Sequence, residues 1–152
     1  MTGSSNRSFV LIAEDDGLLR NAVVRMLVAD GYSVLEAADG AEALEVWQAR
    51  RDSIGLVMSD VQMPSMTGLE LYERLRQLDP ATPVILATSD PEVACTVRTS
   101  SDPRLRLLAK PYNRDELIDL AADLMTGGHR SGANGERPET PALGENPAIT
   151  LT

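Results

Sequence analysis

Residues 9–16 read FVLIAEDD, a run of five apolar residues that ends abruptly in three acids. A continuous apolar run of this length is typical of a strand that is buried on both faces, as the strands of parallel sheets are. Residues 17–29, which follow, place apolar side chains at helical spacing, and Gly31 then supplies a helix stop. The start of the chain therefore predicts a buried strand, a cluster of carboxylates at its end, and a helix.

The same alternation of a short apolar run and an amphipathic stretch recurs along the chain. Five such units in about 120 residues favour an α/β fold with a parallel sheet that helices cover on both faces. The fourth helical stretch, residues 91–102, is rich in Val, Thr and Ser, so we expect a short or mobile element there. The last helix begins with Asn113 and Glu116, spaced as a capping box. The further strands are expected at residues 33–37, 56–59, 84–87 and 105–109.

The length of 152 residues suits one domain of ordinary size together with its ends. We expect the domain at residues 8–126 and a short flexible N-terminus at residues 1–7. Residues 127–152 contain five Gly and three Pro with almost no apolar periodicity, which predicts a disordered tail.

The composition excludes several classes of function. With 23 acidic and 14 basic residues the net charge is −9, which disfavours direct binding to the backbone of DNA or RNA. No apolar run is long enough for a membrane helix, and residues 1–8 lack the apolar stretch of a secretory signal, so we expect a cytoplasmic protein without membrane contact. Cys95 and His129 are the only residues of their types, which excludes a disulfide, a Cys/His zinc cluster and a Cys–His or Ser–His dyad within the domain.

Residues that carry chemistry follow the predicted strands, where open parallel sheets collect their functional groups. Neighbouring carboxylates resist ionising together, and a bound Mg²⁺ relieves that repulsion while leaving positions for phosphate oxygens. Lys110 is the only lysine among the 14 basic residues, and a compact ammonium there suits a phosphoryl group. The residues at the strand ends are Glu14, Asp15, Asp16, Asp60, Thr88, Ser89 and Lys110.

Each of these residues also has a purely structural explanation when taken alone. Residues 14–16 suit the N-terminus of a helix, where the dipole favours acids. Asp60 suits a turn, the pair Thr88-Ser89 suits a helix cap, and Lys110 before Pro111 suits a surface turn. Their joint occurrence at four strand ends favours a common site.

Four stretches together resemble the receiver domain of two-component response regulators. They are VLIAEDD at 10–16, MSDVQMP at 58–64 with Met66 and Gly68 after it, LATS at 86–89, and KPY at 110–112. The resemblance covers about residues 8–126. It implies a doubly wound five-stranded parallel sheet of flavodoxin-like receiver topology, with strand order 2-1-3-4-5.

The resemblance also implies a role for each site residue. Asp60 takes a phosphoryl group from the phosphohistidine of a histidine kinase or histidine phosphotransfer protein, forming an aspartyl phosphate that acts as a signalling switch. The protein catalyses only its own phosphorylation and dephosphorylation, and it is expected to be a monomer or a weak dimer. The other implied roles are a Mg²⁺ site made by Glu14, Asp15, Asp60 and the main-chain carbonyl of Gln62, contacts of Lys110 and Thr88 with the phosphoryl oxygens, and a cradle completed by the N–H groups of Val61 and Ser89.

Two departures from the family pattern fall on the face that most members use to signal. The family usually has an aromatic residue three positions before the lysine, where this chain has Leu107. The usual Gly-Ala before the fifth strand is replaced by Pro103-Arg104. The phosphotransfer chemistry is therefore better supported than the output mechanism.

Two other functions compete with the phosphoacceptor switch. A Mg²⁺-dependent phosphohydrolase with an aspartyl-phosphate intermediate typically places a second acid two residues after the nucleophile, where this chain has Gln62. A binding module that keeps the fold without being phosphorylated does not require the set of Asp60, Thr88 and Lys110. Both alternatives are thus less favoured by the sequence.

Overall fold

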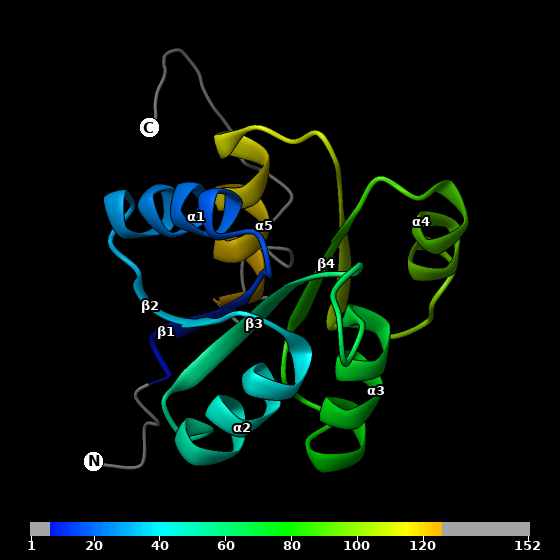
Figure 1. Cartoon of the computed structure of the whole chain (residues 1–152), viewed down its shortest axis with the longest axis horizontal. Coiled ribbons are helices and arrows are strands. Elements are labelled where there is room, and N and C mark those ends of the chain that lie inside the picture. Colours follow the sequence, from blue (N-terminus) through cyan, green and yellow to red (C-terminus); the bar gives the residue numbers. More distant parts are fainter. Residues whose placement is uncertain (1–6, 126–152) are drawn as a thin grey trace.

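Five strands and five helices alternate along residues 7–125, the part of the chain that the computed structural model describes (Figure 1). The alternation follows the apolar pattern of the sequence, since each fully buried run forms a strand and each amphipathic stretch forms a helix. The elements are β1 (Phe9–Ala13), α1 (Gly17–Ala29), β2 (Ser33–Ala37), α2 (Gly40–Arg50), β3 (Ile54–Asp60), α3 (Gly68–Leu78), β4 (Val84–Thr88), α4 (Pro91–Arg98), β5 (Leu105–Ala109) and α5 (Arg114–Met125).

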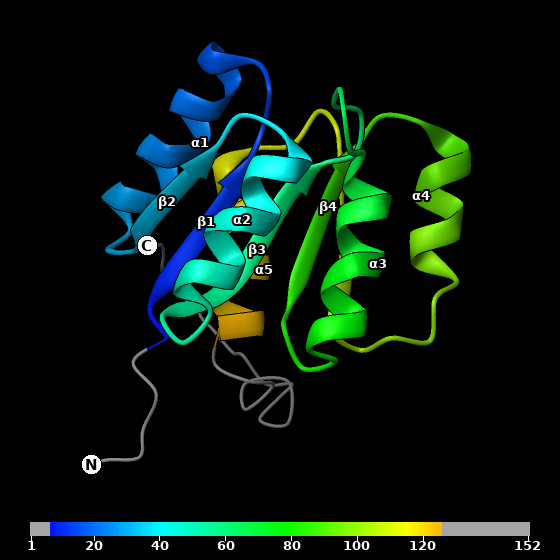
Figure 2. The ribbon, with the colours of Figure 1, turned by 60° about the horizontal axis from the view of Figure 1, so that its bottom comes forward.

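The strands form one parallel sheet in the order β2-β1-β3-β4-β5, which confirms the predicted doubly wound topology. Helices α1 and α5 cover one face, and α2, α3 and α4 cover the other (Figures 1 and 2). Alternate residues of β1 serve the two faces: Val10 and Ile12 pack beneath α1 and α5, whereas Leu11 and Ala13 pack beneath α2 and α3. A strand needs apolar residues at every position when both faces are buried, which explains the continuous apolar runs.

Two strands extend further than the sequence predicted. β3 runs to Asp60 and β4 runs to Thr88, because Asp60 pairs with Ala87 and Thr88 pairs with Ala109 in the neighbouring strands. Both polar residues are therefore the last residues of rigid strands rather than the first residues of loops. Their backbones are fixed by the sheet.

The helix ends agree with the signals in the sequence. Gly31 follows α1 with φ of 97°, a conformation that favours glycine. Asn113 and Glu116 form the predicted capping box, each donating its backbone N–H to the other's side chain at 2.9 Å. The fourth helix is short, as predicted, and ends at Arg98, with Asp90 as its N-cap. Because Asp90 caps this helix, the explanation that Thr88 and Ser89 serve only as its cap does not hold.

The predicted flexible N-terminus at residues 1–7 lies outside the described residues except for Arg7, and the predicted disordered tail at residues 127–152 lies wholly outside them. Within residues 7–125, no helix is both long enough and apolar enough to cross a membrane.

Candidate phosphoryl-acceptor site

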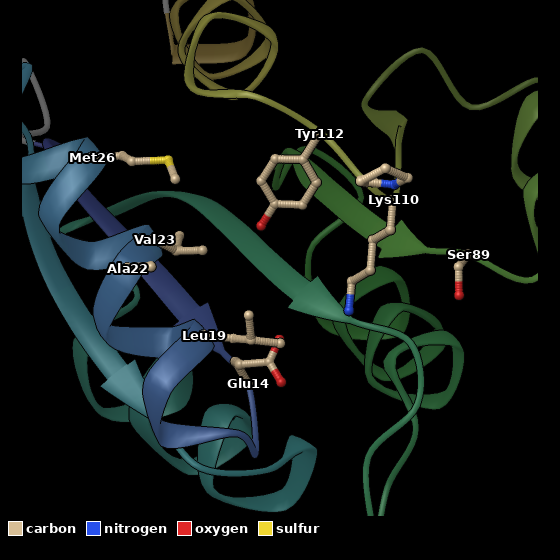
Figure 3. Close-up of a pocket in the computed structure, with 9 residues that line it drawn as sticks. Glu14, Leu19, Ala22, Val23, Met26, Ser89, Lys110 and Tyr112 are labelled. Atoms are coloured by element: carbon tan, nitrogen blue, oxygen red, sulfur yellow. The ribbon is translucent and has the colours of Figure 1, made fainter.

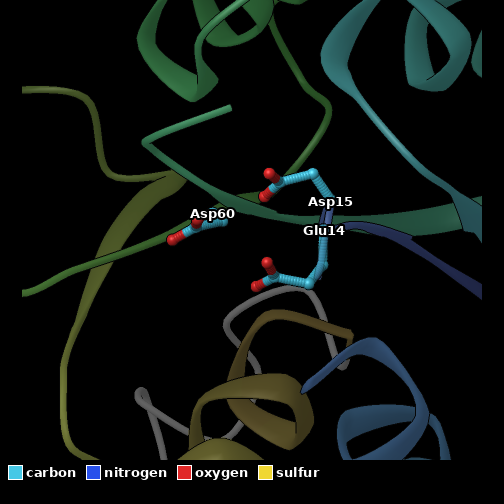
Figure 4. Close-up of side chains that lie close together, drawn as sticks. All are labelled: Glu14, Asp15 and Asp60. Atoms are coloured by element: carbon cyan, nitrogen blue, oxygen red, sulfur yellow. The ribbon is translucent and has the colours of Figure 1, made fainter. Parts of the chain in front are cut away.

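Three carboxylates meet at the carboxyl edge of the sheet. Glu14 and Asp15 follow β1, and Asp60 ends β3, the strand that pairs with β1 (Figure 4). One oxygen from each side chain lies within 4.8 Å of the oxygens of the other two. Carboxylate oxygens are the ligands that Mg²⁺ prefers, so the donor set fits this ion.

Glu14 is the most deeply buried member of the cluster, with 8% of its surface exposed. Burial raises the pKa of its carboxyl group, and the charges of Asp60 and Asp15 raise it further. The N–H of Asp16, which donates to Glu14 Oε2 at 3.1 Å, and the ammonium of Lys110 act in the opposite direction. The net upward shift of the Glu14 pKa, caused chiefly by burial, means that its charged form is costly here unless a cation compensates it.

Lys110 brings a positive charge to Asp60. Its Nζ donates to Asp60 Oδ1 at 2.6 Å, and the Asp60 side chain is only 10% exposed. The lysine backbone is fixed by its own N–H, which donates to the carbonyl of Thr88 at 2.9 Å. The only lysine of the chain is therefore held beside the predicted nucleophile.

Thr88 and Ser89 lie at the end of β4, on the other side of Asp60 from β1. Thr88 is 3% exposed, and its Oγ1 accepts a hydrogen bond from the N–H of Asp90 at 3.0 Å. Since Oγ1 is an acceptor in this bond, its own proton is left to donate to another group. The Ser89 N–H has no acceptor among residues 7–125.

The structure contradicts the expectation that the N–H of Val61 is open to a phosphoryl group. Val61 is buried, and its N–H donates to the carbonyl of Ala87 at 3.1 Å. The hydrogen bonding between β3 and β4 continues one residue past Asp60, and this long-range pairing is not visible in the sequence. The next residue, Gln62, is exposed, and its N–H has no acceptor in the described part of the chain.

A pocket of about 370 Å³ opens beside the acidic cluster (Figure 3). Its walls come from α1, with Leu19 and Met26 among them, and from the segment after β5. Tyr112 lines this pocket, with its hydroxyl directed toward α1. The side chain of Lys110 extends between Glu14 and Ser89. Burial and the charges of Glu14 and Asp60 raise the pKa of Tyr112 to about 12.

Sequence reasoning assigned no role to Tyr112, although it is part of the KPY motif, and did not single out Arg20. The Arg20 guanidinium donates from Nη1 to the carbonyl of Glu14 at 2.7 Å. No sequence pattern signalled this contact, because arginines are common on helix surfaces. The side chains that the sequence did predict for the site follow or end four strands, β1, β3, β4 and β5, and lie at the same edge of the sheet.

Comparisons with known proteins agree with this architecture. The family model described as the response regulator receiver domain matches residues 10–122. The C4-dicarboxylate transport transcriptional regulatory protein DctD of Rhizobium meliloti is 36% identical over 112 residues, which are 74% of this chain and 24% of DctD. The response regulator receiver protein CpdR of Brucella abortus is 30% identical over 110 residues, which are 72% of this chain and 90% of CpdR.

A solved structure shows the same fold. The chemotaxis protein CheY4 of Vibrio cholerae superposes with a TM-score of 0.67 and 31% sequence identity, covering 77% of this chain and 98% of that one. The chain spans only about a quarter of the length of DctD, so the output of such larger relatives does not transfer to it. The match of the family model over most of the domain, together with the fold and the converging residues, shows that this chain belongs to the response regulator receiver domain family.

Proposed function

We propose that Asp60 accepts a phosphoryl group from a phosphohistidine on a histidine kinase or histidine phosphotransfer protein, and that the phosphorylated domain is the active state of a signalling switch. The observation that carries this proposal is the set of charged groups around the Asp60 carboxylate. Its carboxylate lies 2.6 Å from the Lys110 ammonium and within 4.8 Å of oxygens of both Glu14 and Asp15.

Glu14, Asp15, Asp60 and the main-chain carbonyl of Gln62 would hold the Mg²⁺ ion that the family uses. When bound, the ion supplies positive charge that offsets the repulsion between a carboxylate and a phosphoryl group. The protein supplies the rest of the compensation through Lys110, whose ammonium donates to Asp60 Oδ1 before transfer and would then turn to a phosphoryl oxygen.

In the transfer step, an Asp60 oxygen forms a bond to phosphorus while the bond between phosphorus and the donor histidine nitrogen breaks. The electron pair of that bond returns to the imidazole ring, so Asp60 needs no general base. Lys110 and the hydroxyl of Thr88 then donate hydrogen bonds to the phosphoryl oxygens. The N–H groups of Ser89 and Gln62, which have no acceptor among residues 7–125, would complete the cradle, with Gln62 taking the place first assigned to Val61.

The chain offers no acid for the competing phosphohydrolase chemistry at the position two residues after Asp60. Gln62 stands there with an exposed side chain and carries no proton that it can give to a leaving group. We therefore propose that the protein turns over only its own aspartyl phosphate. The alternative of a module that is never phosphorylated leaves the pairing of Lys110 with Asp60 without a function.

The proposal also covers the location of the protein, its oligomeric state and its partners. We propose a cytoplasmic protein that is a monomer or a weak dimer and has no membrane contact. Its net charge of −9 supports the view that this chain does not bind nucleic acid directly. Among the relatives, DctD is named a transcriptional regulatory protein, so DNA binding belongs to that larger protein.

The test is the intact mass of the protein after incubation with acetyl phosphate. We expect the wild type to gain one phosphoryl group in the presence of Mg²⁺ and none in the presence of EDTA. Asp60→Asn should gain none, whereas Asp52→Asn, which changes an exposed aspartate before β3, should behave as the wild type. Labelling of the Asp60→Asn variant at the wild-type level would sink the assignment, and absence of labelling in the wild type would favour the unphosphorylated module.

A further inference from the structure

Arg20, at the end of the first turn of α1, joins three parts of the fold that surround the acidic cluster. Its Nη1 donates to the main-chain carbonyl of Glu14 at 2.7 Å, and its Nε donates to Glu36 Oε1 at 3.1 Å. Glu36 lies in β2, the strand beside β1. The guanidinium therefore links α1 and β2 to the loop that carries two of the three carboxylates.

The contact of Arg20 acts on the backbone of this loop. The N–H of Glu14 already donates to the carbonyl of Ala37 in β2 at 3.1 Å, so Arg20 supplies the second anchor of the same residue. The carbonyl of Glu14 and the N–H of Asp15 belong to one planar peptide group. Fixing that carbonyl thus fixes the orientation of the peptide that joins Glu14 to Asp15.

We propose that Arg20 is a positioning residue for the divalent cation: it holds the Glu14–Asp15 peptide so that both carboxylates face Asp60. The inference rests on the proposed function, because it takes the cluster to be a Mg²⁺ site. Arg20 contacts no carboxylate of the cluster in this structure; its carboxylate partner is Glu36. It acts through the main chain, in the way that groups behind the ligands of a metal orient those ligands.

The direction in which the Mg²⁺ affinity changes when Arg20 is removed distinguishes a positioning role from a simple effect of its charge. A guanidinium that touches the Glu14 carbonyl lies close to the cation site, and like charges repel. Removing Arg20 would therefore strengthen Mg²⁺ binding if charge were its main contribution. Removing it weakens Mg²⁺ binding if the loop loses its orientation.

The experiment is the measurement of the Mg²⁺ dissociation constant by isothermal titration calorimetry, at a temperature where each variant is folded. For Arg20→Gln we expect about a 10-fold weaker affinity, in the range found for groups that support metal ligands. Arg20→Lys keeps the charge but loses the forked donor that reaches two acceptors, so its affinity should fall between those of Arg20→Gln and the wild type. Arg25→Gln makes the same charge change at an exposed position of α1, and its affinity should stay at or slightly above that of the wild type.

An unchanged or tighter affinity in Arg20→Gln would overturn the positioning role and leave the proposed function intact. If the wild type itself binds no Mg²⁺, the metal site and the inference both fail. If the affinities follow the expected order but Asp60 is never phosphorylated, the inference stands and the proposed function fails. Urea unfolding of the variants shows whether a lower affinity reflects partial unfolding, and loss of affinity only in proportion to the unfolded fraction would also contradict the proposal.

Discussion

Gly68, the first residue of α3, packs directly on the backbone at the end of β3, so replacing it should disturb both stability and the position of Asp60. A Cβ at this position would lie 2.4 Å from the carbonyl oxygen of Asp60 and 2.9 Å from Cα of Val61. Both are main-chain atoms, which cannot rotate away as a side chain can. The N–H of Gly68 also donates to the carbonyl of Val61 at 2.8 Å. In Gly68→Ala, the start of α3 must therefore move away from the strand that carries the nucleophile.

The free energy of unfolding should fall by an amount set by three opposing effects. Overpacking of this kind costs about 1–3 kcal/mol, and loss of one hydrogen bond costs about 1 kcal/mol. The higher helix propensity of Ala returns about 1 kcal/mol at most. We expect a net loss of about 1–3 kcal/mol, which lowers the Tm of a domain of this size by roughly 3–12 °C.

Urea unfolding of the wild type and two variants measures this effect. Gly17→Ala is the matched control, because Gly17 is likewise the first residue of its helix, and a Cβ there would meet only the flexible end of Arg20 at 3.8 Å. We expect Gly17→Ala to stay within about 0.5 kcal/mol of the wild type, and Gly68→Ala also to be phosphorylated more slowly. Equal stability of the two variants would refute the reasoning, because it would show that contact with the backbone of β3 has no cost.

Three further predictions follow from other parts of the fold. Burial raises the pKa of Asp102, but hydrogen bonds from Arg76 and Tyr72 outweigh it and hold the pKa below 3.8, so this group stabilises the fold above that pH and loses its effect as the pH falls through the folded value. Asp102→Asn should cost roughly 1.5–3 kcal/mol at neutral pH and flatten the acid limb of stability measured by urea unfolding; an unchanged acid limb would contradict the assignment. Tyr112 has a folded pKa of about 12 against an ordinary value of 10.0, so it stabilises the fold below pH 10 and the effect is lost as the pH rises toward 12. Ultraviolet titration of Tyr112→Phe should lack the last phenolate step, and its presence would show that another tyrosine is responsible. Phosphorylation should raise amide exchange protection in residues 90–103, the segment with the poorest helix formers, and protection gained only elsewhere would show that the signal takes another route.

The helices and strands could be predicted because a doubly wound sheet produces a simple pattern of apolar residues along the sequence. Each strand buried on both faces is a continuous apolar run, and caps such as Asn113 with Glu116 mark helix ends by chemistry within a few residues. The ends of β3 and β4 were less accurate, since Asp60 and Thr88 are polar yet remain paired with neighbouring strands. Local pattern cannot show how far such pairing continues.

The candidate site divides in the same way. Glu14, Asp60 and Lys110 were predictable because the carboxyl ends of parallel strands meet at one edge. The hydrogen bond of the Val61 N–H depends on the register of β3 against β4, and the contact of Arg20 with the Glu14 carbonyl depends on how the loop between β1 and α1 turns. Such main-chain contacts carry no residue-type signal, so they required the structure.

The location of the phosphoryl group is the most direct test of the central claim that Asp60 is the acceptor. Borohydride converts an aspartyl phosphate to homoserine, so the phosphorylated protein can be reduced, digested and sequenced by mass spectrometry. The account predicts homoserine at position 60 only, and only in samples phosphorylated in the presence of Mg²⁺. The account would be contradicted if homoserine replaced a different aspartate. It would also be contradicted if the phosphorylated protein still contained aspartate at position 60 after reduction.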